Sequence, residues 1–213
     1  MNDVIKSPFF RQTMLAFAGM PLLIWAMGNF PEQTLLKQAL SLITILAVFQ
    51  MVGQFFWSRT NRYAVKDLTM GKLMKYHKII GYTFAIALLV HPVFLVVPKF
   101  FEAGVGPGEA FITIITTFTS LGVVLGIIAW SLLVILTITS FIRNKLPMGY
   151  KTWRVFHGVL AILFTVAGLG HAMDLGRHSN PAMSILIIVL FVVGVLPVVK
   201  TYTLEMIKKT GEI

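Results

Sequence analysis

The chain has 213 residues, of which 57% are hydrophobic and only 12% are charged, and its mean hydropathy is +0.84. Soluble domains carry about 25% charged residues, so this composition excludes an ordinary soluble protein and predicts one integral membrane domain over residues 1–213. The chain has no cysteine, which excludes disulfides, thiolate metal sites and cysteine-ligated iron–sulfur clusters.

Six apolar stretches are long enough to cross a bilayer as helices. They predict membrane spans at about residues 13–30, 40–57, 77–97, 115–142, 155–173 and 182–202. We expect the first span to bend near Gly19 and Pro21, and the aromatic run 55–57 to lie at the membrane interface. The loop 98–109, rich in glycine and proline, is expected to be irregular. The predicted fold is an all-α, integral membrane six-helix bundle.

The placement of the basic residues explains the net charge of +10. Six spans put both termini on one side of the membrane, and 15 of the 18 lysines and arginines fall on that side. Only Lys37, Lys99 and Arg177 fall on the other. This bias predicts a multi-pass protein of the plasma (inner) membrane with both termini in the cytoplasm. Nucleic-acid binding is excluded, because the charge is dispersed over loops between membrane spans.

Four of the five histidines lie in two spans with the same spacing. His77 and His91 lie fourteen positions apart in the third stretch, and His157 and His171 lie fourteen positions apart in the fifth. Fourteen residues make about four helical turns and rise about 21 Å, so each helix presents two imidazoles on one face at two depths. Both spans run outward, so the histidines pair by depth.

Two histidine pairs at matched depths predict two stacked bis-histidine haems between spans three and five. His77 and His157 would hold an inner haem, with its iron about 20 Å from that of an outer haem. His91 and His171 would hold the outer haem. A single buried histidine often only hydrogen-bonds across a bundle, but equal spacings at matching depths are harder to explain by packing. His178 is expected to be a surface histidine.

Residues near the histidines are consistent with this interpretation. A small residue lies four positions from each histidine, toward its partner on the same helix, and would give a flat macrocycle room: Gly81, Ala87, Ala161 and Ala167. The pair Gly122 and Gly126 has the spacing that lets two membrane helices approach closely. Tyr150 and Trp153 are expected to be interface aromatics rather than electron relays.

The basic residues are expected to be mainly determinants of topology. A second hypothesis is that some of them bind haem propionates or dock an acidic electron donor. The candidates on the inner side are Arg59, Arg62, Lys75, Lys78, Lys151 and Arg154, and those on the outer side are Lys99 and Arg177.

The runs YHK at 76–78 and WRVFH at 153–157, each with a second histidine fourteen positions after the first, resemble the ferric reductase-like transmembrane domain superfamily. That superfamily includes ferric reductases, NADPH oxidases and the haem subunit of methionine sulfoxide reductase systems. The resemblance covers about residues 40–200. It implies two b-type haems that carry electrons out of the cytoplasm, with the ligands His77, His91, His157 and His171.

Many members of that superfamily continue into a domain that binds FAD and NAD(P)H, but no glycine-rich dinucleotide fingerprint appears here. The expected donor is therefore a separate flavoprotein or a membrane quinol, so that flavin or quinone belongs to a partner. The expected acceptor is extracytoplasmic: ferric iron, a flavoprotein or a periplasmic reductase. The chain would be an electron-transfer subunit, and an enzyme only in a complex.

Two alternatives remain open from the sequence. One keeps the haems and makes the chain a quinol-oxidising membrane subunit. The other is a haem-free transporter or assembly protein whose histidines conduct protons or bind metal.

Overall fold

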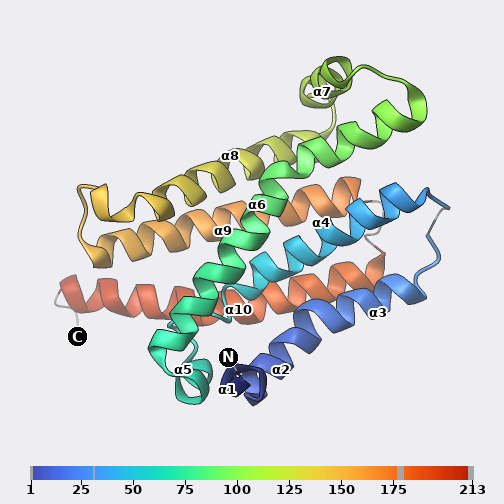
Figure 1. Ribbon diagram of the computed structural model, residues 1–213. Coiled ribbons are helices and arrows are strands. Elements are labelled where there is room, and N and C mark those ends of the chain that lie inside the picture. The colour runs from blue at the N-terminus through green and yellow to red at the C-terminus, as the bar shows by residue number, and fades with distance from the viewer. Residues whose placement is uncertain (1, 31, 177–179, 211–213) are drawn as a thin grey trace.

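The computed structural model describes the backbone of residues 2–30, 32–176 and 180–210, and the side chains of that part from residue 4 to residue 204. Throughout this part every regular element is a helix, and six helices are long and apolar enough to cross a membrane (Figure 1). The predicted all-α class is confirmed, and the number of candidate membrane-spanning helices equals the predicted six. The candidate spans are Pro8–Met27, Leu35–Gly53, Met70–Ala103, Leu121–Phe141, Tyr150–Leu175 and Pro181–Leu204.

The first span is helical throughout, from Pro8 to Met27, and contains a π-helical turn. Ser7 caps it, because its Oγ accepts a hydrogen bond from the backbone N–H of Phe10. The expected irregularity near Gly19 is a π-helical turn that ends just before Pro21, a residue with no N–H to donate. The elements in order are α1 (Asn2–Ile5), α2 (Pro8–Met14), η1 (Leu15–Gly19) and α3 (Met20–Met27).

The third span, α6 (Met70–Ala103), is much longer than the predicted 77–97. Its 34 residues extend about 51 Å, well beyond the hydrocarbon core of about 30 Å. The helix continues through Pro92 and Pro98 and ends at Gly104, whose φ of +64° is left-handed and suits glycine. α6 therefore projects out of the membrane.

The loops around α6 contain helices that the sequence analysis missed. α5 (Arg62–Leu68) lies in the loop before it, capped by Asn61. The prediction that 98–109 is an irregular loop is wrong, because α6 continues to Ala103 and α7 (Pro107–Thr116) begins shortly after it. Proline at a first helical position favours a helix start, so Pro107 begins α7 instead of breaking the chain.

In the aromatic run after α4 (Leu35–Gly53), Phe55 and Trp57 are buried within the protein and Phe56 is half-buried, while the predicted depth of the run at the membrane interface stays a prediction. Trp57 is 0% exposed and packs edge-on against Phe9, with ring centres 4.9 Å apart. The N-terminal segment covers this ring, because Ser7 Oγ and the Phe9 N–H both donate hydrogen bonds to the Asp67 carboxylate in α5. Tertiary contacts between the N-terminal segment and α5 thus remove the ring from the surface.

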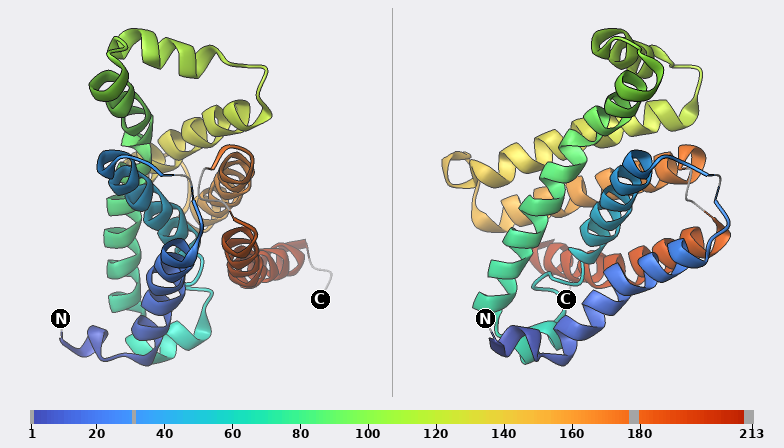
Figure 2. Two further views of the ribbon diagram at one scale, coloured as in Figure 1. Left: turned by 90° about the vertical axis from the view of Figure 1, so that its right-hand side faces the viewer. Right: turned by 45° about the vertical axis from the view of Figure 1, so that its right-hand side comes forward.

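The remaining spans are α8 (Leu121–Phe141), α9 (Tyr150–Leu175) and α10 (Pro181–Thr210), with a short 3₁₀ turn, η2 (Arg143–Lys145), before α9. α8 and α9 lie side by side, α4 packs against α6, and α10 lies beside α3 and α4 (Figures 1 and 2). A central core cluster joins α4, α6, α8 and α9. Its buried members are Met51, Ala85, Ala129, Leu133, Leu136, Phe164 and Ala167.

We predict that alanine at Gly194 in α10 destabilises the bundle. A Cβ there would lie 2.7 Å from Phe56 Cε2 and 3.0 Å from Phe55 Cβ, so the substitution should cost about 1–3 kcal/mol by overpacking. Alanine at Gly71 in α6 is the control, because no atom lies within 4 Å of its Cβ position, and it should be neutral or stabilise by about 0.4–1 kcal/mol. Thermal unfolding in detergent, followed by circular dichroism, measures both. Equal melting temperatures would contradict this packing of α10.

Candidate functional site

The histidines of α6 and α9 meet in two pairs. The ring centres of His77 and His157 are 6.4 Å apart, with 64° between the ring planes. The ring centres of His91 and His171 are 6.3 Å apart, with 79° between the planes. We call these the inner and the outer histidine pair. Because both pairs meet, α6 and α9 run in the same direction, and the equal histidine spacings on the two helices are in register.

The spacing within each pair fits one metal ion between the rings. An imidazole nitrogen binds a metal ion at about 2.0–2.1 Å and lies about 1.1 Å from its ring centre, so two rings on opposite sides of one ion have centres about 6.2–6.4 Å apart. The inner and outer pairs have this separation. Among the described residues, no group of three or more His, Cys, Asp or Glu gathers around a metal position. A metal at either pair would therefore take its other ligands from a cofactor such as haem.

Hydrogen bonds to Nδ1 bear on which ring nitrogen carries the proton. The Nδ1 of His171 lies 2.8 Å from the carbonyl oxygen of Gly122 in α8. A carbonyl only accepts, so this Nδ1 carries the proton and donates it. The Nε2 of His171 then has a free lone pair, as a metal-bound histidine requires.

Two hydroxyl groups have the same effect on the tautomers of His91 and His157. The Oγ1 of Thr44 in α4 lies 3.3 Å from His91 Nδ1 and donates its own hydrogen to the carbonyl oxygen of Leu40, at 2.9 Å. Ser140 Oγ in α8 lies 3.2 Å from His157 Nδ1 and donates to its own helix at 2.6 Å. With its hydrogen on the carbonyl of its own helix, each hydroxyl oxygen can accept a hydrogen bond from an imidazole Nδ1–H. In that arrangement both histidines also have an unprotonated Nε2.

His77 has a different environment. Its Nδ1 is buried and makes no hydrogen bond within the described part of the chain, although the backbone of Gln54 lies nearby. The side chain of Gln54 also comes close to α6, because its Oε1 lies 3.3 Å from the position of a Cβ on Gly81. Gly81 therefore makes room for Gln54.

The other small residues proposed to clear space for a macrocycle have varied surroundings. Ala167 belongs to the central core cluster and Ala161 packs against it, while Ala87 is half-buried. Small residues do lie beside the outer histidine pair, but they come from other positions. They are Gly126, Ala129 and Gly168, which line the same cavity as the pair.

The glycine pair of α8 brings this helix against α9. A Cβ on Gly126 would lie 2.6 Å from His171 Nδ1, and a Cβ on Gly122 would collide with Asp174. The Gly122 N–H also donates a hydrogen bond to the Asp174 carboxylate, at 2.9 Å. The spacing therefore does allow close helix approach, and the space it provides is filled by His171.

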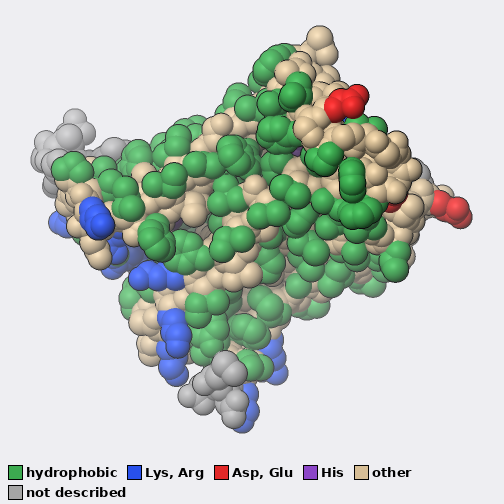
Figure 3. Space-filling view, turned by 45° about the horizontal axis from the view of Figure 1, so that its top comes forward, with side chains coloured by type: hydrophobic (Ala, Val, Ile, Leu, Met, Phe, Trp, Pro, Cys, Tyr) green, Lys and Arg blue, Asp and Glu red, His purple; other side chains and the backbone are tan. Residues whose placement is uncertain are grey.

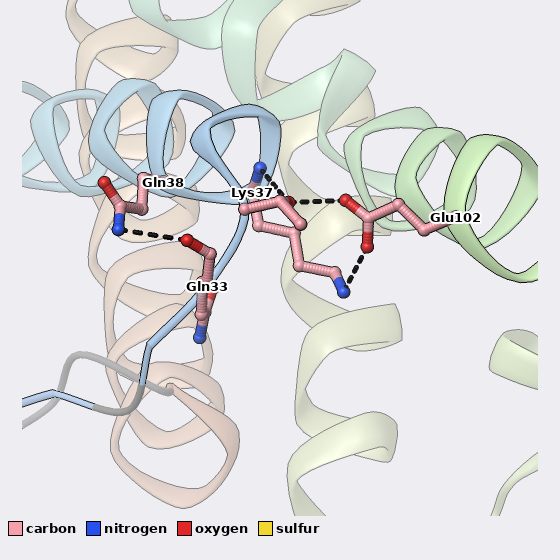
Figure 4. A network of polar contacts seen from close by, with 5 residues as sticks. Gln33, Lys37, Gln38 and Glu102 are labelled. Atoms are coloured by element: carbon pink, nitrogen blue, oxygen red, sulfur yellow. Dashed lines mark hydrogen bonds and ion pairs between the residues drawn. The ribbon is translucent and has the colours of Figure 1, made fainter.

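A cavity of about 940 Å³ opens beside the outer histidine pair, within the size range of small-molecule and cofactor sites. Its walls come from α4, α6, α7, α8, α9 and α10, and Lys37, Lys99 and Glu102 lie at its outer end. Lys37 forms an ion pair with Glu102 that joins the start of α4 to the end of α6 (Figure 4). Lys99, a predicted propionate partner, thus lines the cavity that holds the outer pair. The sequence analysis placed Lys37 on the outer side but did not name it as a residue of this site.

Three of the basic residues predicted on the inner side lie close together. Arg59, Arg62 and Arg154 line one polar pocket of about 210 Å³, together with Thr60 and Thr201. Lys78 follows His77 on α6 and is exposed at the helix surface. Arg177 and His178 lie outside the described residues.

Sequence reasoning missed several residues that contact the histidine pairs. Ser140 and Thr44 bond the histidines from other helices, and no local pattern marks them. Trp153 stacks on His157, with ring centres 4.9 Å apart and planes 27° apart. Its position one helical turn before His157 could have indicated this contact.

These features define a six-helix membrane protein with two facing histidine pairs. The chain belongs to the ferric reductase like transmembrane component family, whose model matches residues 43–168. The matched region contains His77, His91 and His157, and ends just before His171. The family resemblance expected from the sequence is confirmed. Membership in this family suggests a membrane electron-transfer component.

An uncharacterized protein of Archaeoglobus fulgidus is 39% identical over 165 residues, which cover 77% of this chain and 89% of the relative. No solved structure matches the chain.

We predict that Ser140→Ala changes the tautomer of His157. Loss of the acceptor removes about 1 kcal/mol of preference for the Nδ1–H form, a shift of about fivefold in the tautomer ratio. Nitrogen NMR of ¹⁵N-histidine-labelled chain without cofactor measures that ratio. Thr139→Ala is the control, because Thr139 Oγ1 bonds only to carbonyl oxygens of its own helix. Identical spectra for the two variants would contradict the assignment.

Proposed function

We propose that this chain is a transmembrane dihaem cytochrome b that moves electrons across the membrane. The inner histidine pair would hold one b-type haem and the outer pair the other. The observation that carries this proposal is the separation of 6.4 and 6.3 Å between the paired rings, the spacing expected for two axial imidazoles on one iron. The tautomer set at His171 by the Gly122 carbonyl supports it independently, and the hydroxyl contacts of His91 and His157 allow the same tautomer there.

When bound, each haem would supply one-electron chemistry, and because both histidines of a pair would ligate its iron, dioxygen would not bind directly there. The chain's own residues orient the ligands. Acceptors on Thr44, Ser140 and Gly122 keep the Nδ1 proton in place and make the imidazoles more basic ligands.

Between the two histidine pairs, the chain places apolar side chains that exclude water. Phe164 is buried in the central core cluster, and Phe84, Leu88 and Leu160 pack against it. These positions lie between the paired histidines on α6 and α9. They would keep the two sites separate and dry.

The cations near each pair are proposed partners of haem propionates. On the inner side, the pocket of Arg59, Arg62 and Arg154 is the first candidate, with Lys78 beside His77. On the outer side, Lys99 lines the cavity of the outer pair. Arg177 remains a proposal from the sequence.

Charge distribution supports the proposed orientation, with both termini in the cytoplasm. Lys and Arg side chains gather at one end of the molecule and Asp and Glu at the opposite end (Figure 3). The inner pair would then accept electrons from a cytoplasmic flavoprotein or a quinol. The outer pair would deliver them to an extracytoplasmic acceptor such as ferric iron, a flavoprotein or a periplasmic reductase.

We predict that the purified chain binds two haems and that alanine at His91 or His171 leaves about one per chain, because one axial ligand of the outer haem is lost. Reduced pyridine haemochrome spectra, with protein measured by amino-acid analysis, give the ratio. The haem held by the separate inner pair should keep a low-spin spectrum when it is reduced.

His178→Ala is the matched control, because it removes the chain's fifth histidine and should leave two haems bound. Full haem content in the His91 and His171 variants would show that these residues are not ligands. A preparation that takes up no haem during supplementation would rule out the dihaem function as a whole.

A further inference from the structure

A continuous stack of rings leads from the surface to the inner histidine pair. Tyr150, the first residue of α9, is 45% exposed, and its ring is stacked on Trp153 with centres 6.3 Å apart and planes 17° apart. Trp153 in turn is stacked on His157 at 4.9 Å. Residues three and four apart share a helix face, so α9 itself aligns the three rings.

Arginines from separate elements surround this stack. The guanidinium carbon of Arg143, in η2, lies 4.8 Å from the Tyr150 ring centre and 5.0 Å from that of Trp153. Arg59, in the turn after α4, donates a hydrogen bond to the Tyr150 hydroxyl at 3.0 Å. Arg154 lies 6.0 Å from the Tyr150 ring centre. Cations at these distances are attracted to the aromatic faces and hold a positive charge around the exposed ring.

Opposite charge is sparse at this end of the molecule. Among the side chains that the structure describes, Asp67 is the single carboxylate there, and it accepts hydrogen bonds from Ser7 and the Phe9 backbone. Arg59 and Arg143, which contact the exposed ring of Tyr150, therefore add positive charge to this surface. An acidic surface is the complement of such a patch.

We propose that Tyr150, Trp153, Arg59 and Arg143 form the docking surface for an acidic electron-donor protein. Anchoring in lipid headgroups explains an aromatic ring and arginines at the membrane surface. It does not explain why the stack continues through Trp153 to a histidine of the inner pair. The inference rests on the proposed function in naming the partner an electron donor, and it assigns Tyr150 and Trp153 a role beyond that of interface aromatics.

The test measures binding rather than turnover. The haem-loaded chain is placed in nanodiscs of neutral lipid, and association with an acidic flavodoxin is followed by biolayer interferometry between 20 and 500 mM salt, a range over which the Debye length falls several-fold, to about 4 Å. We expect Arg143→Gln to slow association about threefold to tenfold at low salt, with the difference lost at high salt. Tyr150→Leu, which removes the exposed ring, should shorten the lifetime of the complex.

Lys145→Gln is the matched control, because Lys145 is exposed, carries the same charge and lies in the same short turn as Arg143. It should change the association rate less than twofold. Melting temperature and haem content, measured for each variant, show whether folding is intact. If Arg143→Gln fails to fold, the lifetime of the complex is compared between Tyr150→Leu and Lys145→Gln instead.

Three results would overturn the docking surface. The first two are no association of the parent chain with flavodoxin, and equal effects of Arg143→Gln and Lys145→Gln on the association rate. The third is an Arg143→Gln effect that appears only as a smaller rise in melting temperature when phosphatidylglycerol is added to the nanodiscs. The last result would assign the patch to anionic lipid. Failure of the proposed function is separate, because it shows as a chain without haem before any donor is added.

Discussion

The register between α6 and α9 is the constraint on which the rest of the structure depends. Two helices that run in the same direction, each with two histidines at the same spacing, form two facing pairs only if one helix is placed correctly along the other. A shift by one helical turn, about 5.4 Å, would separate both pairs at once. α8 helps to fix this register, since Gly122 and Gly126 leave room for His171 and the Gly122 carbonyl accepts its Nδ1 proton.

The two histidine pairs have different surroundings although their ring separations agree. The outer pair borders a cavity of about 940 Å³ with an ion pair between Lys37 and Glu102 at its outer end. The inner pair is reached through stacked aromatic rings and is flanked by arginines. His77 also differs from the other three histidines in having no hydrogen-bonded Nδ1 within the described residues. The asymmetry suits a carrier that receives electrons at one face and delivers them at the other.

Two half-buried hydroxyl groups in this bundle each contact two partners. Thr44 and Ser140 each return a hydrogen bond to their own helix and accept one from a histidine on another helix. A hydroxyl in a membrane interior needs such partners, because no water is available to satisfy it. The same bonds orient the imidazoles, so the satisfaction of polar groups and the preparation of ligands are one physical requirement.

The sequence by itself determined the features that depend on local periodicity. Apolar length predicted six spans, and the equal histidine spacing predicted two depths and their pairing, because helix rise and turn are the same everywhere. Tertiary structure alone decided which residues of other helices contact the histidines. Thr44 and Ser140 lie 47 and 17 residues from the histidines that they contact, and Trp57 is buried by an N-terminal segment that lies far before it in the sequence. Such contacts depend on how helices pack, and a single helix carries no record of its neighbour's register.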